Sequence, residues 1–252
     1  MNNYVIPNLV KSCAVMKLLA DRPKGITAFQ VEEAADVPRT TAFRILKTLC
    51  SEGFAQKRGK LYFAGPGLIQ IGLTSLKSLE IRTLSIPFLS KLAENTDFTA
   101  HLAIPGNWNS LILEVHDSPN PLRVASRSGT TVPLHCSSTG KVFLAFKFED
   151  RLKDYFSSGT LRKYTDRTIT DLPGMLNEIE RIKADGIAVD RQEFHEGIWC
   201  AAAPVSDSSG QVTAAIGVTG PAVHADNKKK SEICKYVKET ATRLSGELGY
   251  NS

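Results

Sequence analysis

The segment from Pro38 to Leu49, PRTTAFRILKTL, constrains the fold of this chain more than any other. Its apolar residues recur at i, i+3, i+4 and i+7, which is typical of a helix with one buried face. These residues are Ala42, Ile45, Leu46 and Leu49. Pro38 suits the first turn of such a helix, because the N–H group that proline lacks has no partner there. Burial of the stripe turns the other side chains outward, with Thr41 at the margin. The outward residues are Arg39, Thr40, Phe43, Arg44 and Lys47.

Two further helices and a ribbon are predicted around this helix. Asn8 is a suitable cap for a first helix, whose expected apolar stripe is Leu9, Cys13, Met16 and Ala20. Thr27 and Gln30 have the spacing of a capping box and predict the start of a second helix. Residues 54–63 alternate loosely between apolar and polar, and the basic run KRGK interrupts them, which favours a two-stranded ribbon with a basic tip. Three helices followed by such a ribbon indicate a winged helix-turn-helix.

The excess positive charge of the chain is confined to this first quarter. Residues 1–67 hold ten Lys and Arg against five Asp and Glu, whereas the rest of the chain is balanced. We therefore expect a head that binds a polyanion, attached to a body with another task. For double-stranded DNA, the residues expected to read the major groove are Arg39, Thr40, Thr41 and Arg44. Those expected on phosphates are Lys47, Lys57, Arg58 and Lys60. The alternatives are a helical subdomain with a solvated basic face, or a head that docks another protein.

A second segment is expected to join copies of the chain. Beyond Gly65-Pro66-Gly67, the helix predicted up to Leu79 is too apolar for a solvated linker, so it must bury against its own chain or a second copy. A twofold partner would place two heads on two half-sites. We predict a DNA-binding domain at 1–65, a linker and dimerisation helix at 66–84, and a sensing domain at 85–252.

The remaining chain has an α+β pattern. Strands are expected at 98–104, 110–115, 122–126, 187–190, 200–205 and 212–218, and helices at 86–94, 141–148 and 231–248. The small polar residues Ser137-Ser138-Thr139-Gly140 precede one of these helices. Backbone N–H groups at a helix start form a general cradle for a carboxylate or phosphate.

Other classes are disfavoured by composition. The five cysteines are scattered and form no CxxC pair, so neither a disulfide framework nor a zinc site is indicated. No apolar run is long enough to span a membrane, and the N-terminus lacks the features of a signal peptide. We expect a soluble, cytoplasmic protein without membrane contact, cofactor or bound metal.

Three motifs, two in the body and one in the head, are specific enough to indicate a family. They are TVPLHCSSTGKVFLAF from Thr131 to Phe146, GIAVDRQEFHEGIWCAAAPVSDSSGQVTAAIGVTGP from Gly186 to Pro221, and the helix PRTTAFRILKTL. Together they resemble the IclR family of bacterial transcription regulators, over nearly the whole chain and in the same order. The resemblance implies a winged helix-turn-helix, a linker helix and a C-terminal GAF-like domain with an antiparallel sheet. It also implies dimers or dimer pairs that respond to a small organic acid, aromatic acids included.

The family motifs also imply an effector site. Its backbone donors would be Ser138 and Thr139, with Asp190 and Cys200 opposite them. Gly217 and Thr219 would contribute from a strand, and Val124, Val132 and Ile198 would form an apolar wall. Gly217 departs from the family pattern, in which many members carry a hydroxyl residue there. Trp199 and the pair Phe194-His195 are also individual to this chain, so an effector larger or less polar than glyoxylate or pyruvate is allowed.

Two chemical alternatives remain open at this point. A cysteine hydrolase would use Cys136 or Cys200 with His135 or His195, although no GxSxG, HExxH or P-loop motif is present. Strand neighbours point to opposite faces, so His135 and Cys136 are poorly placed to pair with each other. A metal site would need carboxylates and imidazoles such as those of Asp190, Glu193, His195 and Glu196, for which surface roles are the simpler interpretation. The effector, the operator, the sign of regulation and dimer versus tetramer are not determined by the sequence.

Overall fold

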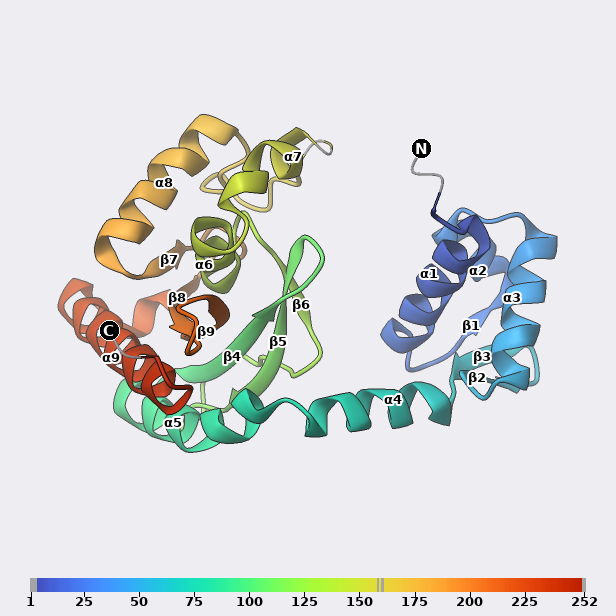
Figure 1. The fold of residues 1–252 in the computed structure, drawn as a ribbon, viewed down its shortest axis with the longest axis horizontal. Coiled ribbons are helices and arrows are strands. Elements are labelled where there is room, and N and C mark those ends of the chain that lie inside the picture. The colour runs from blue at the N-terminus through green and yellow to red at the C-terminus, as the bar shows by residue number, and fades with distance from the viewer. Residues whose placement is uncertain (1–3, 158, 160, 251–252) are drawn as a thin grey trace. The chain divides into compact units, whose positions relative to one another are not determined.

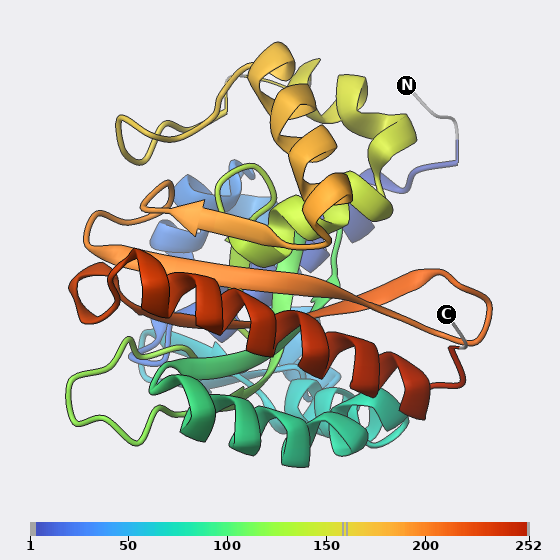
Figure 2. The same cartoon turned by 90° about the vertical axis from the view of Figure 1, so that its left-hand side faces the viewer.

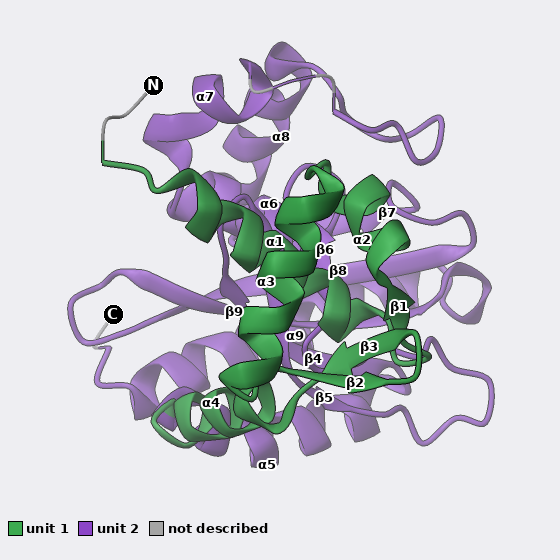
Figure 3. Ribbon diagram, turned by 90° about the vertical axis from the view of Figure 1, so that its right-hand side faces the viewer, with its two compact units in different colours: residues 1–79 green, residues 80–252 purple. Residues whose placement is uncertain are grey.

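A computed structural model describes residues 4–157, 159 and 161–250, and the chain forms two compact units (Figures 1 and 3). Unit 1 spans residues 1–79 and unit 2 spans residues 80–252. The elements of unit 1 are α1 (Pro7–Asp21), β1 (Ile26–Thr27), α2 (Ala28–Ala35), α3 (Arg39–Ser51), β2 (Ala55–Arg58), β3 (Leu61–Ala64) and α4 (Pro66–Lys77).

The core of unit 1 forms around α3 as the sequence predicted. Its apolar stripe is buried against α1, α2 and a three-stranded antiparallel sheet of order β1-β3-β2. The stripe residues are Ala42, Ile45, Leu46 and Leu49. The predicted capping box of α2 is also confirmed, since Gln30 N–H donates to Thr27 Oγ1 over 3.2 Å and Gln30 Oε1 accepts from Thr27 N–H. The predicted ribbon is confirmed as β2 and β3, joined at a turn where Gly59 has a positive φ of 60°.

Two predictions for unit 1 are wrong in detail. α1 starts at Pro7 with Ile6 as its cap, and the proposed cap Asn8 lies inside the helix. Its buried residues are Val15 and Leu19, whereas Leu9 and Cys13 of the predicted stripe are exposed. The helix is apolar on more than one side, so periodicity alone could not select the face that packs.

The elements of unit 2 build one sheet with helices on both faces. They are α5 (Glu80–Thr96), β4 (Thr99–Pro105), β5 (Asn109–His116), β6 (Thr131–Pro133), α6 (Ser138–Phe146), η1 (Glu149–Arg151), α7 (Leu152–Ser157), α8 (Leu172–Asp185), β7 (Ala188–Arg191), β8 (Ile198–Ser206), β9 (Val212–Pro221), η2 (Ala222–His224) and α9 (Asn227–Glu247). The sheet is antiparallel, with strand order β6-β5-β4-β9-β8-β7. This is the α+β arrangement with an antiparallel sheet that the sequence predicted. The likeness to GAF domains stays a prediction.

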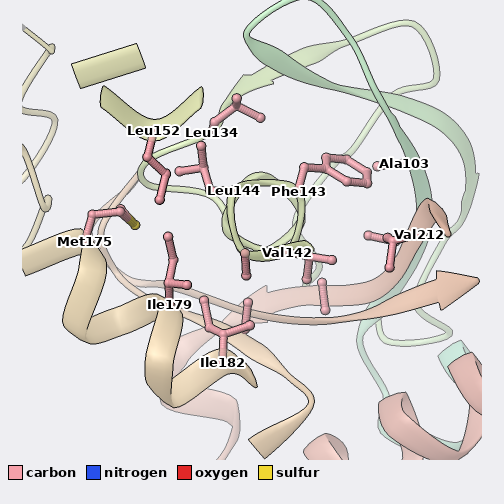
Figure 4. Packing of buried hydrophobic residues seen from close by; sticks show 14 of the residues in the cluster. Ala103, Leu134, Val142, Phe143, Leu144, Leu152, Met175, Ile179, Ile182 and Val212 are labelled. Carbon is pink, nitrogen blue, oxygen red and sulfur yellow. The ribbon is translucent and has the colours of Figure 1, made fainter. Parts of the chain in front are cut away.

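α5 and α9 lie side by side along one face of this sheet (Figure 2). α6 packs on the other face, and α8 packs against α6. Figure 4 shows Val142, Phe143 and Leu144 projecting from α6, with Met175, Ile179 and Ile182 of α8 beside it. The sheet offers α6 small side chains, which allow a close approach of helix to strands. These are Ala103, Ala188, Ala202 and Ala215.

Three expectations for unit 2 need correction. Residues 122–126 form no strand, because side-chain hydrogen bonds hold this segment in place of a strand ladder. α6 starts at Ser138, before the predicted start at Lys141, because Ser137 is its cap. α5 starts at Glu80, six residues before the predicted start at Ile86, and continues through Pro87.

Among the described residues, no helix combines the length and the apolar character that crossing a membrane requires.

Candidate functional site

A cavity of about 210 Å³ lies in unit 2, beside the start of α6. Eight of the nine residues that the family motifs implied for the effector site line it. They are Val124, Val132, Ser138, Thr139, Asp190, Ile198, Cys200 and Thr219. The fold thus brings together residues from segments that are up to about a hundred positions apart in the sequence.

The floor of the cavity is a register row across three strands. Asp190 on β7 pairs with Cys200 on β8, which in turn pairs with Thr219 on β9. The Sγ atom of Cys200 lies 3.1 Å from Thr219 Oγ1 and donates a hydrogen bond to it. Side chains paired across antiparallel strands share one face, so this row presents a carboxyl, a thiol and a hydroxyl to the same space.

The start of α6 supplies the donors. Ser137 caps the helix by accepting a hydrogen bond from Gly140 N–H over 3.1 Å, and its own hydroxyl donates to the Pro133 carbonyl over 2.6 Å. Ser138 and Thr139 are the first two helical residues. Their N–H groups have no acceptor within the helix and lie at its positive end. These two amides can therefore hold a carboxylate or another small anion.

An irregular segment forms one wall of the cavity. Thr99 Oγ1 donates to the Val124 carbonyl over 3.1 Å, and Gly129 N–H donates to the Ile112 carbonyl over 2.8 Å. Between these anchors, the residues that line the cavity are Val124, Ala125, Ser126 and Arg127. With Val132 and Ile198, Val124 gives the cavity the apolar side expected from the sequence.

Gly217 is the predicted site residue that is not among those lining the cavity. A Cβ atom at this position would lie 2.3 Å from the Ala201 carbonyl oxygen, which is backbone and cannot move aside cheaply. The glycine therefore serves the close packing of β8 and β9. The missing hydroxyl that the sequence suggested as a lost effector contact has no room in this backbone.

Several residues that line the cavity were not predicted as effector contacts. Phe194 and His195 had been noted only as individual features of this chain and Ser137 only as part of the helix-start cradle, and His101 and Arg127 were not predicted at all. The position of His101 on the cavity face results from the pairing of β4 with β9, because its partner Gly217 is two residues from Thr219 on the same strand.

Asp190 adjoins a buried ion cluster. Its Oδ1 atom accepts a hydrogen bond from Glu193 N–H over 2.6 Å. Lys141 is fully buried, and its Nζ lies 2.6 Å from Glu193 Oε1 and 2.9 Å from Glu178 Oε1. Burial raises the pKa of Asp190 to about 7, and also raises that of Glu193 while Lys141 opposes the rise. Near neutral pH, a protonated Asp190 can donate a hydrogen bond to an acid in the cavity instead of repelling it.

The arrangement disfavours cysteine catalysis. His135 and Cys136 lie in a turn and not on a strand, and the two nitrogens of His135 lie 3.0 Å from Tyr155 Oη and from the Arg162 carbonyl. Burial raises the pKa of both the Cys136 and the Cys200 thiols. A nucleophilic thiolate requires the opposite shift. Among the described residues, no group of three or more His, Cys, Asp or Glu side chains is placed to hold a metal ion.

The residues expected to contact DNA lie on α3 and at the turn between β2 and β3. Seven of them are exposed and Thr41 is half-buried. The exposed residues are Arg39, Thr40, Arg44, Lys47, Lys57, Arg58 and Lys60. Within the described part of unit 1, no basic side chain lies within ion-pairing distance of a carboxylate, since the first ion pair along the chain involves Arg82. Lys57 and Arg58 lie over the rings of Tyr62 and Phe63, which orients their charges at the tip of the ribbon.

Comparison with known sequences matches both units to one family. The sequence model described as "IclR helix-turn-helix domain" matches residues 9–59, and the one described as "Bacterial transcriptional regulator IclR C-terminal" matches residues 73–246. The chain is 30% identical over 249 residues to the DNA-binding transcriptional repressor YiaJ of Escherichia coli K12, covering 96% of this chain and 88% of the relative. None of these similarities supports the hydrolase alternative.

Solved structures agree with this comparison. The IclR protein of Thermotoga maritima is similar with a TM-score of 0.70 and 28% identity, covering 96% of this chain and 98% of that one. An IclR homologue of Microbacterium hydrocarbonoxydans, solved in complex with 4-hydroxybenzoate, is similar with a TM-score of 0.78 and 20% identity, covering the same shares. At that identity the second likeness concerns the fold.

Proposed function

The chain belongs to the IclR family of bacterial transcriptional regulators, and on that premise we propose that it is a repressor controlled by a small organic acid. The observation that carries this proposal is the cavity of unit 2, which is lined both by Ser138 and Thr139 at the start of α6 and by the polar sheet floor. A carboxylate would accept hydrogen bonds from the Ser138 and Thr139 N–H groups. Thr219, Cys200 and Asp190 would orient the rest of the molecule.

The volume of the cavity favours a small ligand. Engineered cavities of about 150 Å³ hold benzene, so about 210 Å³ suits a molecule of one ring or less. The relative from Microbacterium hydrocarbonoxydans, solved with 4-hydroxybenzoate, supports an aromatic acid as one candidate. The apolar side made by Val124, Val132 and Ile198 would contact the ring or alkyl part of the effector.

Operator binding is assigned to α3 and the ribbon. Arg39, Thr40, Thr41 and Arg44 lie in the first half of α3, from which side chains reach base edges in a major groove. Lys47, Lys57, Arg58 and Lys60 would contact phosphates. Because acidic side chains do not neutralise these bases, their full charge is available to the DNA. A regulator that binds chromosomal DNA acts in the cytoplasm.

We also propose that two copies pair through unit 1. α4 buries none of its residues within the chain, and its exposed apolar side chains Ile69, Ile71 and Leu73 need a cover. Leu9 and Val10 of α1 are likewise exposed. A twofold pair would present two α3 helices to two half-sites. An acid that favours one placement of these helices over another would change operator affinity by population shift.

The test is a titration of the full chain against DNA. An operator is first selected from a random duplex library, and its affinity is measured by fluorescence anisotropy over a range of salt concentrations. Affinity should fall steeply with salt, because bound phosphates release counterions. Addition of 4-hydroxybenzoate or another acid of similar size should then shift the binding curve.

A matched pair of variants separates the two sites. Arg44→Ala should weaken operator binding and leave acid binding intact, whereas Thr219→Val, which removes a hydroxyl from the cavity floor, should do the reverse. Salt-insensitive binding, failure to select any operator, or acid binding that survives Thr219→Val unchanged would contradict the proposal.

A further inference from the structure

His101 lies in the cavity with a polar atom that has no partner. It is on β4, its side chain is about 5% exposed, and it lines the cavity. Its Nδ1 atom is buried and makes no hydrogen bond. One other side-chain atom among the described residues shares this condition, Glu114 Oε2, but it lies 2.7 Å from Arg82 in an ion pair. His101 Nδ1 therefore lacks both kinds of partner.

A buried nitrogen of this kind calls for an explanation. Buried polar atoms in folded proteins are nearly always hydrogen-bonded, and an orphaned one costs free energy. Burial also lowers the pKa of His101 to about 4, so the ring is neutral at physiological pH. A neutral imidazole carries one donor and one acceptor nitrogen. Nδ1 can therefore serve a hydroxyl or a carbonyl oxygen, according to the tautomer.

The residues paired with His101 supply no such partner. They are Gly217 on β9, which has no side chain, and Val115 on β5, which is apolar. Thr219 lies two residues further along β9, where its hydroxyl accepts a hydrogen bond from Cys200 and makes none to His101. The protein thus leaves the imidazole edge free at a place where the cavity gives room for a ligand.

We propose that His101 is a specificity-determining residue of this site, and that its Nδ1 atom hydrogen-bonds a second oxygen of the effector, apart from the carboxylate. The inference rests on the proposed function, since it takes the carboxylate to be held at the start of α6. His101 projects from the sheet and not from that helix, so it meets a different part of the ligand. A plain carboxylic acid would leave Nδ1 unpaired, and sites with such unpaired groups discriminate against the ligand that lacks the partner.

The experiment compares matched acids that differ by one oxygen. Isothermal titration of the full chain uses 4-hydroxybenzoate with benzoate, 3-hydroxybenzoate with benzoate, and pyruvate with propanoate. The wild-type chain should bind the oxygenated member of at least one pair about tenfold more tightly, as expected when one hydrogen bond is lost and its partner stays buried.

Two variants at position 101 then test whether His101 causes this preference for the oxygenated acid. His101→Leu should remove the discrimination between the two acids. His101→Asn should retain most of it, because the asparagine amide places a polar atom near the position of Nδ1. Without ligand, His101→Leu should be at least as resistant to urea as the wild type, since it removes an unpaired buried nitrogen. This measurement shows that the variant is folded and tests the orphaned state of Nδ1 independently.

The outcomes separate this inference from the function on which it rests. If both members of each pair bind equally and both change operator affinity, His101 has no such role and the proposed function stands. Discrimination that persists in His101→Leu, or a loss in His101→Asn as large as in His101→Leu, also overturns the inference. If no acid binds and operator affinity does not respond, the proposed effector class fails together with it.

Discussion

The hydroxyl of Ser110 on β5 donates a hydrogen bond to the hydroxyl of Thr139 in the first turn of α6, across 2.8 Å. Both residues are buried. The bond ties the helix start to a strand that is 29 positions earlier in the chain. With its acceptor side occupied by Ser110, the Thr139 hydroxyl can donate its own hydrogen into the cavity. The pair therefore sets the orientation of a hydroxyl that the proposed effector would meet.

Ser110→Ala is expected to weaken acid binding without unfolding the chain. Loss of one neutral hydrogen bond between buried groups costs about 1 kcal/mol, so acid affinity should fall by about fivefold. Isothermal titration with 4-hydroxybenzoate measures the change. Thr240→Ala is the control, since Thr240 lies half-buried on α9, outside the residues that line the cavity, and its hydroxyl donates within its own helix. Equal affinities for Ser110→Ala and the wild type would show that Thr139 needs no such support.

Lys141→Met is expected to destabilise the protein strongly. Lys141 is fully buried between Glu178 and Glu193. Its removal leaves the buried Glu193 carboxylate without a counter-charge, whereas Glu178 keeps its contacts with Arg181 and Arg191. Breaking a buried pair in this way costs about 3–5 kcal/mol. Urea unfolding followed by circular dichroism gives the free energy of unfolding.

A double variant and a control variant show whether the Lys141→Met result is specific to the buried cluster. Adding Glu193→Gln to Lys141→Met should recover part of the loss, because one uncompensated charge is removed. Lys229→Met breaks a 3.3 Å ion pair with Asp97 between exposed side chains and should change stability by less than about 1 kcal/mol. A single Lys141→Met variant as stable as Lys229→Met would contradict the importance of the buried cluster.

Elements with one apolar face could be predicted from the sequence, and elements without one could not. α3 was predicted in register because Ala42, Ile45 and Leu46 leave a polar opposite side. The buried face of α1 was predicted wrongly because apolar residues such as Leu9 and Val15 lie on different sides of the same helix. The family resemblance, and not the hydrophobic pattern, predicted the residues at the start of α6 and on β7–β9 that line the cavity.

Residues whose position depends on tertiary pairing were missed. Residues 122–126 look like a strand, but the Val124 carbonyl is held by the Thr99 side chain and not by a strand ladder. His101 reaches the cavity only because β4 pairs with β9 in the observed register. Neither contact leaves a local pattern in the sequence, since each joins segments that are far apart along the chain.

The stability of Asp190→Asn relative to the wild type should rise with pH. Burial raises the pKa of Asp190 to about 7 from an ordinary value of 3.8. Between these values the folded state binds a proton that the unfolded state does not, so wild-type stability falls as pH rises through this range. Asparagine does not titrate, so the difference in free energy of unfolding should grow by about 2 kcal/mol between pH 5 and pH 8.

The titratable neighbours of Asp190 are the same in both proteins, so their effects largely cancel in that difference. They are Lys141, Glu193 and Cys200. Asp207→Asn is the matched control, because Asp207 is exposed and hydrogen bonds from Ser209 lower its pKa. Its difference from the wild type should stay constant between pH 5 and pH 8. A flat curve for Asp190→Asn would show that Asp190 is ionised in the folded protein throughout this range.

Arg44→Ala and Arg58→Ala should affect DNA binding in different ways. Arg44 lies on the outer face of α3, where it can reach base edges. Its loss should therefore reduce the difference in binding free energy between the selected operator and random duplex by about 1–3 kcal/mol. Arg58 lies at the tip of the ribbon over the Phe63 ring, so its loss should weaken both duplexes alike. Each variant should also reduce the slope of log affinity against log salt by about one. Lys228→Ala, in the basic run at the start of α9, should change neither quantity, and an effect there equal to that of Arg44→Ala would show that binding reflects general charge and not a reading helix.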